Sequence, residues 1–184
     1  MTQEYRTVNT LSELAEALLK GETKIKINFE DCSFLYPELL RRGVDLCDID
    51  ITEWDVSGVT DMGGMFYRAE KFNQPIGNWD VSKVTHMHGM FMYAEKFNQP
   101  IGNWDVSSVT DMYAMFQYVV NFNQPLGNWD VSNVINMNFM FYHAKNFNQP
   151  IGNWDVSTVT NTLQVCHMFR DCPINNSNKP KGIE

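Results

Sequence analysis

Five aspartates recur at a fixed interval and are the first residues that could do chemistry. Each follows a tryptophan, and successive ones lie 25 residues apart. They are Asp55, Asp80, Asp105, Asp130 and Asp155. If they stack at a strand spacing of about 4.8 Å, neighbouring carboxylates repel each other by about 1 kcal/mol in water and by about 3–4 kcal/mol at an effective dielectric of 20. This aspartate column therefore needs compensating groups.

The sequence leaves two interpretations of the aspartate column open. In the structural one, each carboxylate accepts hydrogen bonds from a nearby serine and from backbone N–H groups, as in an Asx turn, and Lys26 screens one end. In the functional one, the column binds cations or a regularly spaced basic ligand. No Asp-x-Asp-x-Asp-Gly loop accompanies it, so the calcium signal is weak.

Methionine and tryptophan are better explained as core residues. The methionines stand beside Phe and Ala at helical spacing, which is typical of packing rather than of soft-metal binding. They are Met62, Met65, Met87, Met90, Met112, Met115, Met137 and Met140. The tryptophans are flanked by apolar Ile and Val, which favours burial over a ligand-stacking platform.

Histidine and cysteine show no ligand or catalytic spacing. His86, His88, His143 and His167 fall at different repeat positions. Cys32, Cys47, Cys166 and Cys172 follow no disulfide framework or paired zinc spacing, and we expect reduced thiols. The chain also lacks a nucleophile elbow and a Gly-rich phosphate loop. We expect no catalytic residue, metal or cofactor.

One repeated unit must position all these residues. Trp54, Trp79, Trp104, Trp129 and Trp154 mark five units, which predict a solenoid whose coils bury their apolar faces against each other. Residues 76–81 predict a short strand, residues 84–97 a helix capped by Ser82, and residues 98–103 the return turn. The expected fold is α/β, a right-handed leucine-rich-repeat-like solenoid with parallel strands on one face and helices on the other.

The chain ends depart from the unit and predict caps. Residues 1–45 form the N-terminal cap, with a helix from Thr10 to Lys20, an edge strand at 24–27 that places Lys26 beside Asp55, and a degenerate helical coil at 33–42. The five repeats span residues 46–172, and their pattern arrives three residues late at His167. Residues 173–184 form a polar tail that we expect to be frayed.

Variation between repeats gathers on the predicted helical face and is rich in aromatic residues. They are Tyr67, Tyr93, Tyr118, Phe139, Tyr142 and His143. If the protein recognises a specific partner, we expect the contact here, because invariant strands recognise only a repetitive ligand. The alternative is drift on a solvated face.

The net charge of the chain indicates which classes of partner it can bind. The formal net charge is -8 and the pI is about 4.9, which disfavours nucleic acid and anionic membranes as partners and favours a basic protein partner. The chain has no run of eighteen apolar residues, and its first residues show no charged region followed by an apolar stretch, so we expect no export leader in the sequence as written. We expect no membrane insertion, and a cytoplasmic or viral-particle location if the sequence is complete, or the cell surface if a leader was removed.

The string Phe-Asn-Gln-Pro-Ile-Gly-Asn-Trp-Asp-Val-Ser begins at Phe72 and recurs from residues 97, 122 (with Leu126) and 147. It resembles the BspA-like bacterial surface protein repeat, also described as a mycoplasma lipoprotein-type repeat of unknown function and a divergent relative of leucine-rich repeats. The resemblance covers residues 46–172 and implies the fold but no catalytic residues; adhesion or protein binding is proposed for secreted members. Val84 stands where leucine-rich repeats carry Asn or Cys, so we expect no asparagine ladder there.

Two functions follow as expectations. The first is a non-catalytic solenoid scaffold for protein–protein interaction. The second is a structural component of a viral or cell-surface assembly, which would self-associate.

Overall fold

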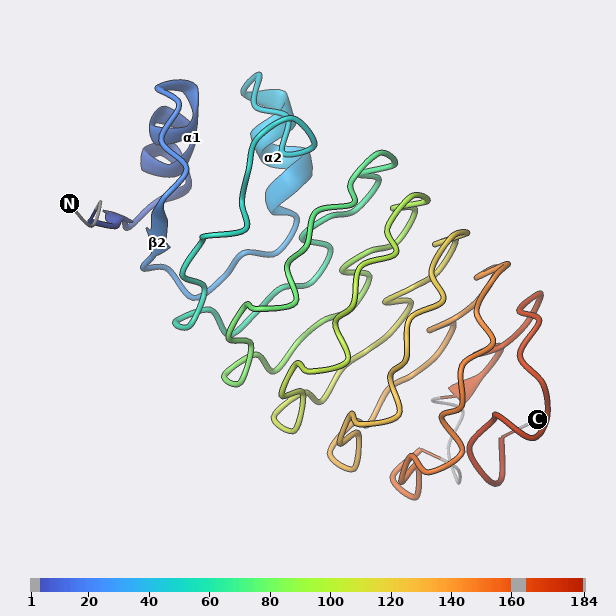
Figure 1. Ribbon diagram of the computed structural model, residues 1–184. Coiled ribbons are helices and arrows are strands. Elements are labelled where there is room, and N and C mark those ends of the chain that lie inside the picture. Colours follow the sequence, from blue (N-terminus) through green and yellow to red (C-terminus); the bar gives the residue numbers. More distant parts are fainter. Residues whose placement is uncertain (1–3, 160–164, 184) are drawn as a thin grey trace.

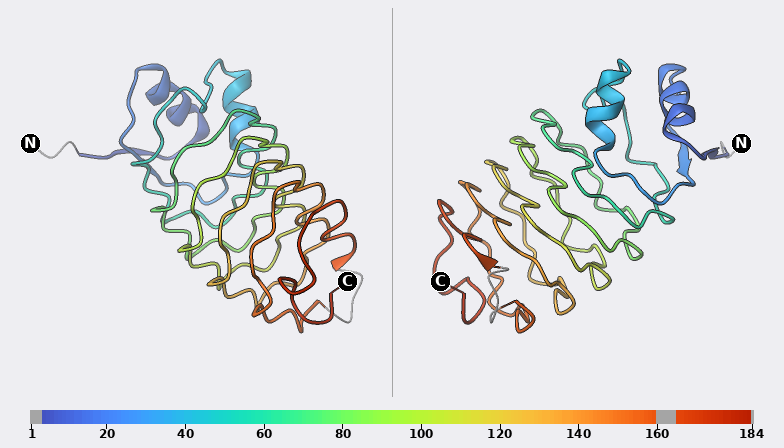
Figure 2. Two further views of the ribbon diagram at one scale, coloured as in Figure 1. Left: turned by 45° about the vertical axis from the view of Figure 1, so that its right-hand side comes forward. Right: turned by 180° about the vertical axis from the view of Figure 1, so that it is seen from behind.

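The repeats lie side by side as successive coils. The structure is a computed structural model that describes residues 4–159 and 165–183, and Figures 1 and 2 show the coils one behind another along the chain. Backbone hydrogen bonds join equivalent positions, as in Thr85 N–H to Thr60 O at 2.8 Å and Thr110 N–H to Thr85 O at 2.9 Å. Each coil therefore supplies hydrogen-bond partners to the next.

The helices and strands of the described residues all lie in the N-terminal part of the chain. They are β1 (Arg6–Val8), α1 (Leu11–Leu19), β2 (Ile25–Ile27) and α2 (Leu35–Arg41). Strands β1 and β2 pair in parallel with Arg6 opposite Ile25. The predicted cap helix, edge strand and degenerate helix are thus present within two residues of their expected bounds.

The local signals that predicted α1 act as expected. The Thr10 side chain accepts a hydrogen bond from the Glu13 N–H at 3.2 Å, which caps the start of the helix. Gly21 follows its end with φ at 79°, a conformation that glycine adopts at little steric cost. Ile25 and Ile27 are buried while Lys26 is exposed, so β2 has the alternation of a half-buried strand.

The helix predicted over residues 84–97 does not form. Those residues form turns, with φ at 56° for Gly89 and 64° for Tyr93, and such left-handed residues interrupt a right-handed helix. Donors that would bond within a helix point to the next coil instead, as in Phe91 N–H to Met115 O at 3.0 Å. The apolar residues are spaced three and four apart because successive turns bury them, and not because a helix forms.

The strand predicted over residues 76–81 is also absent. Parallel pairing falls further along each unit, in isolated bridges from Asp61 to His86, from His86 to Asp111 and from Asp111 to Asn136. The alternation of Trp79 and Val81 was read correctly as inward-facing, since these side chains are 4% and 1% exposed. The alternation of inward-facing and outward-facing side chains did not indicate which residues pair between coils.

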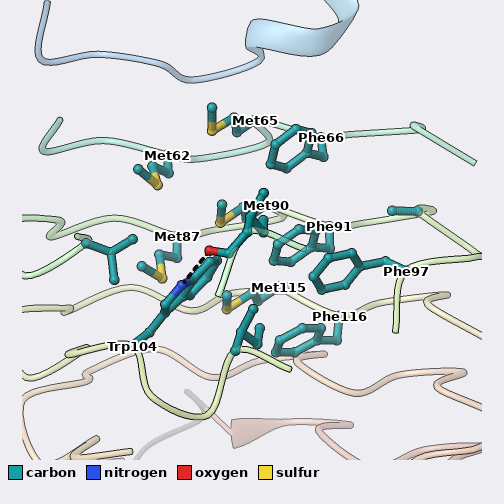
Figure 3. Close-up of a cluster of buried hydrophobic side chains, with 14 of the residues drawn as sticks. Met62, Met65, Phe66, Met87, Met90, Phe91, Phe97, Trp104, Met115 and Phe116 are labelled. Atoms are coloured by element: carbon teal, nitrogen blue, oxygen red, sulfur yellow. Dashed lines mark hydrogen bonds between the residues drawn. The ribbon is translucent and has the colours of Figure 1, made fainter. Parts of the chain in front are cut away.

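Stacked columns of identical side chains form the core. Phe91 packs on Phe97 with ring centroids 4.0 Å apart, and on Phe66 and Phe116 of the flanking coils at 5.6 and 5.8 Å. Figure 3 shows the methionine and phenylalanine columns side by side. The eight repeat methionines and five tryptophans are buried, which confirms their interpretation as core residues.

Each regular tryptophan also bonds to the preceding coil. The Trp104 Nε1–H donates to Ile76 O at 3.1 Å, the dashed line in Figure 3. Trp79, Trp129 and Trp154 repeat this contact. Trp54 faces the N-terminal cap instead, and its buried Nε1 has no partner among the described residues.

An asparagine ladder runs through the return turns. The Asn98 N–H donates to Asn73 Oδ1 at 2.9 Å, and the Asn123 N–H donates to Asn98 Oδ1 at 3.0 Å. Asn148 and Asn175 continue the series. The ladder lies away from the Val84 position, where the sequence predicts none, and its asparagines fall in the predicted return turns.

The C-terminal end is packed rather than frayed. Ile174 and Ile183 are buried, and Asn178 Nδ2 donates to Asn148 O at 2.9 Å. Glu184 lies outside the described residues. Among the residues that the structure describes, no helix has the length and apolar character of a membrane span.

Candidate functional site

The aspartate column is a series of Asx turns. Asp80 Oδ1 accepts the Ser82 N–H at 3.1 Å and the Ser82 hydroxyl at 2.6 Å. Asp55, Asp105 and Asp130 make the same two bonds to Ser57, Ser107 and Ser132, and Asp155 accepts the Ser157 N–H at 3.0 Å. The serine and backbone hydrogen bonds that the structural interpretation predicts are therefore present.

At four of these aspartates, Asp55, Asp80, Asp130 and Asp155, the pKa of the carboxyl group is lowered. The serine hydroxyl lowers the pKa of Asp80 and of Asp130, and the Ser157 N–H lowers that of Asp155. Burial raises the pKa of Asp55, but Ser57 and Lys26 together lower it below its usual value. Lys26 Nζ lies 3.2 Å from Asp55 Oδ2, so the predicted screening at this end is present.

A second column of polar residues occupies the positions where the coils pair through isolated bridges. The sequence did not predict this column. It comprises Asp31, Asp61, His86, Asp111 and Asn136. Asp61 Oδ1 accepts the Gly63 N–H at 2.7 Å and Asp111 Oδ1 accepts the Tyr113 N–H at 2.9 Å, so these carboxylates also stabilise turns. No group of three His, Cys, Asp or Glu residues within 4–159 and 165–183 is arranged to hold a metal ion.

The variable aromatic residues lie on turns and contact each other. Tyr118 stacks on Tyr93 with centroids 4.7 Å apart and on His143 at 4.6 Å, with interplanar angles of 12° and 6°. Arg68 Cζ lies 5.7 Å from the Tyr93 ring centroid at one end. At the other end His143 Nε2 lies 3.0 Å from Asp171 Oδ2. The stacked column therefore ends in charged groups on both sides.

A second group of rings joins this column. Phe139 contacts Tyr142 at 5.6 Å, and Tyr142 contacts Tyr118 at 5.6 Å and His143 at 4.4 Å. Tyr67 contacts Tyr93 at 6.1 Å. All six predicted aromatic positions are thus linked by ring contacts and are half-buried; we call them the aromatic surface.

Two further residues extend the aromatic surface beyond the predicted set. The Phe139 ring lies 5.9 Å from Tyr113 and 5.4 Å from His167. Tyr113 is 40% exposed. The two preceding repeats carry Gly63 and His88 at the position of Tyr113. A comparison of the repeats could therefore have identified Tyr113 as a variable, aromatic position.

Four of the aromatic residues hold left-handed backbone. Their φ angles are 64° at Tyr93, 59° at Tyr118, 59° at Phe139 and 58° at His143. Gly64 and Gly89 occupy the Phe139 position in the first two regular coils. A left-handed non-glycine residue costs about 1–2 kcal/mol, so these side chains stand where glycine would be easier to accommodate.

Burial makes three of the four cysteines poor nucleophiles. All four are unpaired. Burial raises the pKa of Cys32 to about 12, and of Cys47 and Cys172 to about 11. Because the thiolate is the nucleophile and the metal ligand, these three protonated thiols are poorly suited to either role at neutral pH.

A protein family matches most of the chain. A family described as "Mycoplasma protein of unknown function, DUF285" matches residues 39–135 and 101–181. The two matched ranges overlap within the repeats. No curated protein and no solved structure matches the chain.

Proposed function

The chain belongs to the DUF285 family, and from that premise we propose that it is a non-catalytic scaffold that binds another protein through the aromatic surface. The family is described as one of unknown function, so the proposal is built on this chain's own residues. Its partner would contact Phe139 and Tyr142 together with the rings beside them.

One observation carries this proposal: bulky aromatic residues stand at strained, half-exposed positions. Phe139 has φ at 59° where two earlier coils have glycine. Strained residues that persist despite an easier alternative cluster at functional sites. We propose that binding, in addition to the ring contacts of Phe139 with Tyr142 and His167, accounts for a bulky residue at this position.

The physical character of the surface suits a protein interface. Tyrosine and arginine are enriched among the residues that dominate binding energy, and both occur here, in Tyr118 and Arg68. Ring contacts on several sides restrict the side chains before binding, so less conformational entropy is lost when a partner docks. The surface is therefore partly preorganised.

The arrangement of the coils supports the same role. We infer that they form a leucine-rich-repeat-like solenoid, a class whose elongated surfaces commonly bind proteins. The resemblance to BspA-like surface repeats, for whose secreted members protein binding is proposed, points in the same direction. Under this proposal the aromatic surface binds the partner, and the aspartate column stabilises turns rather than binding a ligand.

Affinity purification from extracts of the source organism tests the proposal. The variant F139G/Y142A is compared with the unaltered chain and with K83A, a matched change at an exposed site outside the aromatic surface. We expect proteins that K83A retains and F139G/Y142A loses. Identical sets from all three proteins would overturn the proposal, and recovery of this chain alone would favour the self-assembling alternative.

A further inference from the structure

A hollow opens where α2 meets the first regular coil. It has a volume of about 340 Å³ and is lined by Tyr36, Pro37, Leu40, Arg41, Tyr67 and Arg68. Leu40 is 47% exposed, although it is a large apolar side chain, whereas Tyr36 is buried. The hollow therefore offers an uncovered apolar surface beside the aromatic surface, with Tyr67 common to both.

The charge of this hollow differs from that of the whole protein. Two of its lining residues are arginines and none is acidic, although the chain has a formal net charge of -8. Arg41 is paired with Glu38. Arg68 is exposed and makes no salt bridge within 4–159 and 165–183; its guanidinium lies 5.4 Å from the Tyr67 ring centroid. Arg68 is thus held beside the hollow with its charge uncompensated by a carboxylate.

A neighbouring hollow lacks this combination of apolar lining and uncompensated positive charge. It has a volume of about 440 Å³ and also includes Pro37, Arg41 and Tyr67, but Asp31 and Glu38 are among its lining residues. Its arginine is therefore offset by carboxylates. Only the smaller of these two hollows pairs apolar surface with an excess of positive charge.

We infer that the smaller hollow binds an apolar side chain with a carboxylate close by, as presented by a hydrophobic, acidic peptide segment. The apolar group contacts Leu40 and Tyr67, and the carboxylate pairs with Arg68, whose planar guanidinium suits bidentate contact. The inference deepens the proposed binding function and rests on it. It also sets the local partner chemistry as acidic, opposite to the basic partner that the net charge favours.

Three small probes of matched shape test this inference by NMR titration of the full chain. They are 3-phenylpropionate, its amide 3-phenylpropionamide, and the cation 3-phenylpropylamine. We expect 3-phenylpropionate to perturb the amide signals of Leu40, Tyr67 and Arg68 and to bind about fivefold tighter than the amide, in proportion to one partly exposed ion pair. The amine should bind more weakly than either.

Variants locate the contact. R68Q should remove the preference for the carboxylate over the amide, and L40A should weaken all three probes. K83Q removes a positive charge that does not line the hollow and should leave the titrations unchanged. Unaltered spectra elsewhere in the chain show that each variant is folded.

Equal affinity for the three probes, no perturbation at Leu40, or an unchanged preference in R68Q would overturn the inference. F139G/Y142A leaves the hollow's lining intact and should bind 3-phenylpropionate like the unaltered chain. Loss of partner capture with normal probe binding separates the aromatic surface from the hollow. A failed probe titration with normal partner capture rejects the hollow alone.

Discussion

The Tyr118 ring lies parallel to the imidazole of His143, with centroids 4.6 Å apart and an interplanar angle of 6°. His143 then contacts Asp171 in the last coil. The Phe139 N–H donates a hydrogen bond to the carbonyl of Cys166 in that coil, 27 residues ahead. At the same position one repeat earlier, the Ala114 N–H donates to the carbonyl of Asn138, 24 residues ahead. His143, at the end of the stacked column, thus still contacts the last coil despite the three extra residues that the sequence pattern indicates there.

The contact between Tyr118 and His143 should be measurable as a coupling energy. In a double-mutant cycle with Tyr118→Leu and His143→Leu, we expect a coupling of about 0.5–1.5 kcal/mol in the free energy of unfolding. Urea denaturation at neutral pH measures it. Additive effects of the two changes would show that the stacking contributes nothing.

The tryptophan column contains its own control. Trp104→Phe removes the hydrogen bond to Ile76 O, whereas Trp54→Phe removes an Nε1–H that has no partner in the described part of the chain. We therefore expect Trp104→Phe to cost about 1 kcal/mol more than Trp54→Phe. The comparison is made by urea denaturation, and equal losses would contradict the geometry.

The asparagine ladder predicts a rescue by an isosteric acceptor. Asn98 Oδ1 accepts the Asn123 N–H and Gln124 Nε2, both at 3.0 Å. Asn98→Ala leaves these donors without a protein acceptor and should lower the free energy of unfolding by about 1–3 kcal/mol. Asn98→Asp keeps an acceptor oxygen and should recover most of that loss. Equal destabilisation by the two changes would argue against the ladder.

The aspartate column predicts a pH dependence with a defined sign. Because the folded pKa of Asp80 is lowered by Ser82, its contribution to stability is present above the unfolded pKa of about 3.9 and is lost as the pH falls through the folded pKa. Ser82→Ala should cost about 0.5–1 kcal/mol at pH 7, a value reduced by exposure.

The difference between Ser82→Ala and the unaltered chain should shrink as the pH falls below about 3.9. Denaturation at several pH values measures this. Calcium should change neither protein, since the carboxylates serve turns. A calcium-dependent gain that Asp80→Asn, Asp105→Asn and Asp130→Asn together abolish would restore the cation-binding interpretation.

Much of the packing was predictable because the repeat period fixes which side chains are equivalent. Trp104 and Met90 could be assigned to the core from their apolar neighbours, and Thr10 and Gly21 marked the ends of α1. Lys26 could be placed beside Asp55 because β2 aligns with the first repeat. These inferences rest on burial and local capping, which single sequences encode well.

The backbone path of the coils was not predictable in the same way. Apolar residues three and four apart fit both a helix and a series of turns, and Tyr93 gives no warning of its left-handed φ because it is neither Gly nor Asn. The asparagine ladder depends on how one coil lies against the next. The invariance of Asn98 and its equivalents across the return turns was the available signal.

The central claim is that aromatic residues occupy strained positions for binding rather than for folding. The free energies of unfolding of Phe139→Gly and Phe139→Ala test it most directly. We predict that the glycine variant lies within about 1 kcal/mol of the unaltered chain, because relief of strain offsets lost ring contacts, and is about 1 kcal/mol more stable than the alanine variant. A loss of about 3–5 kcal/mol in the glycine variant, as for a core phenylalanine, would contradict it.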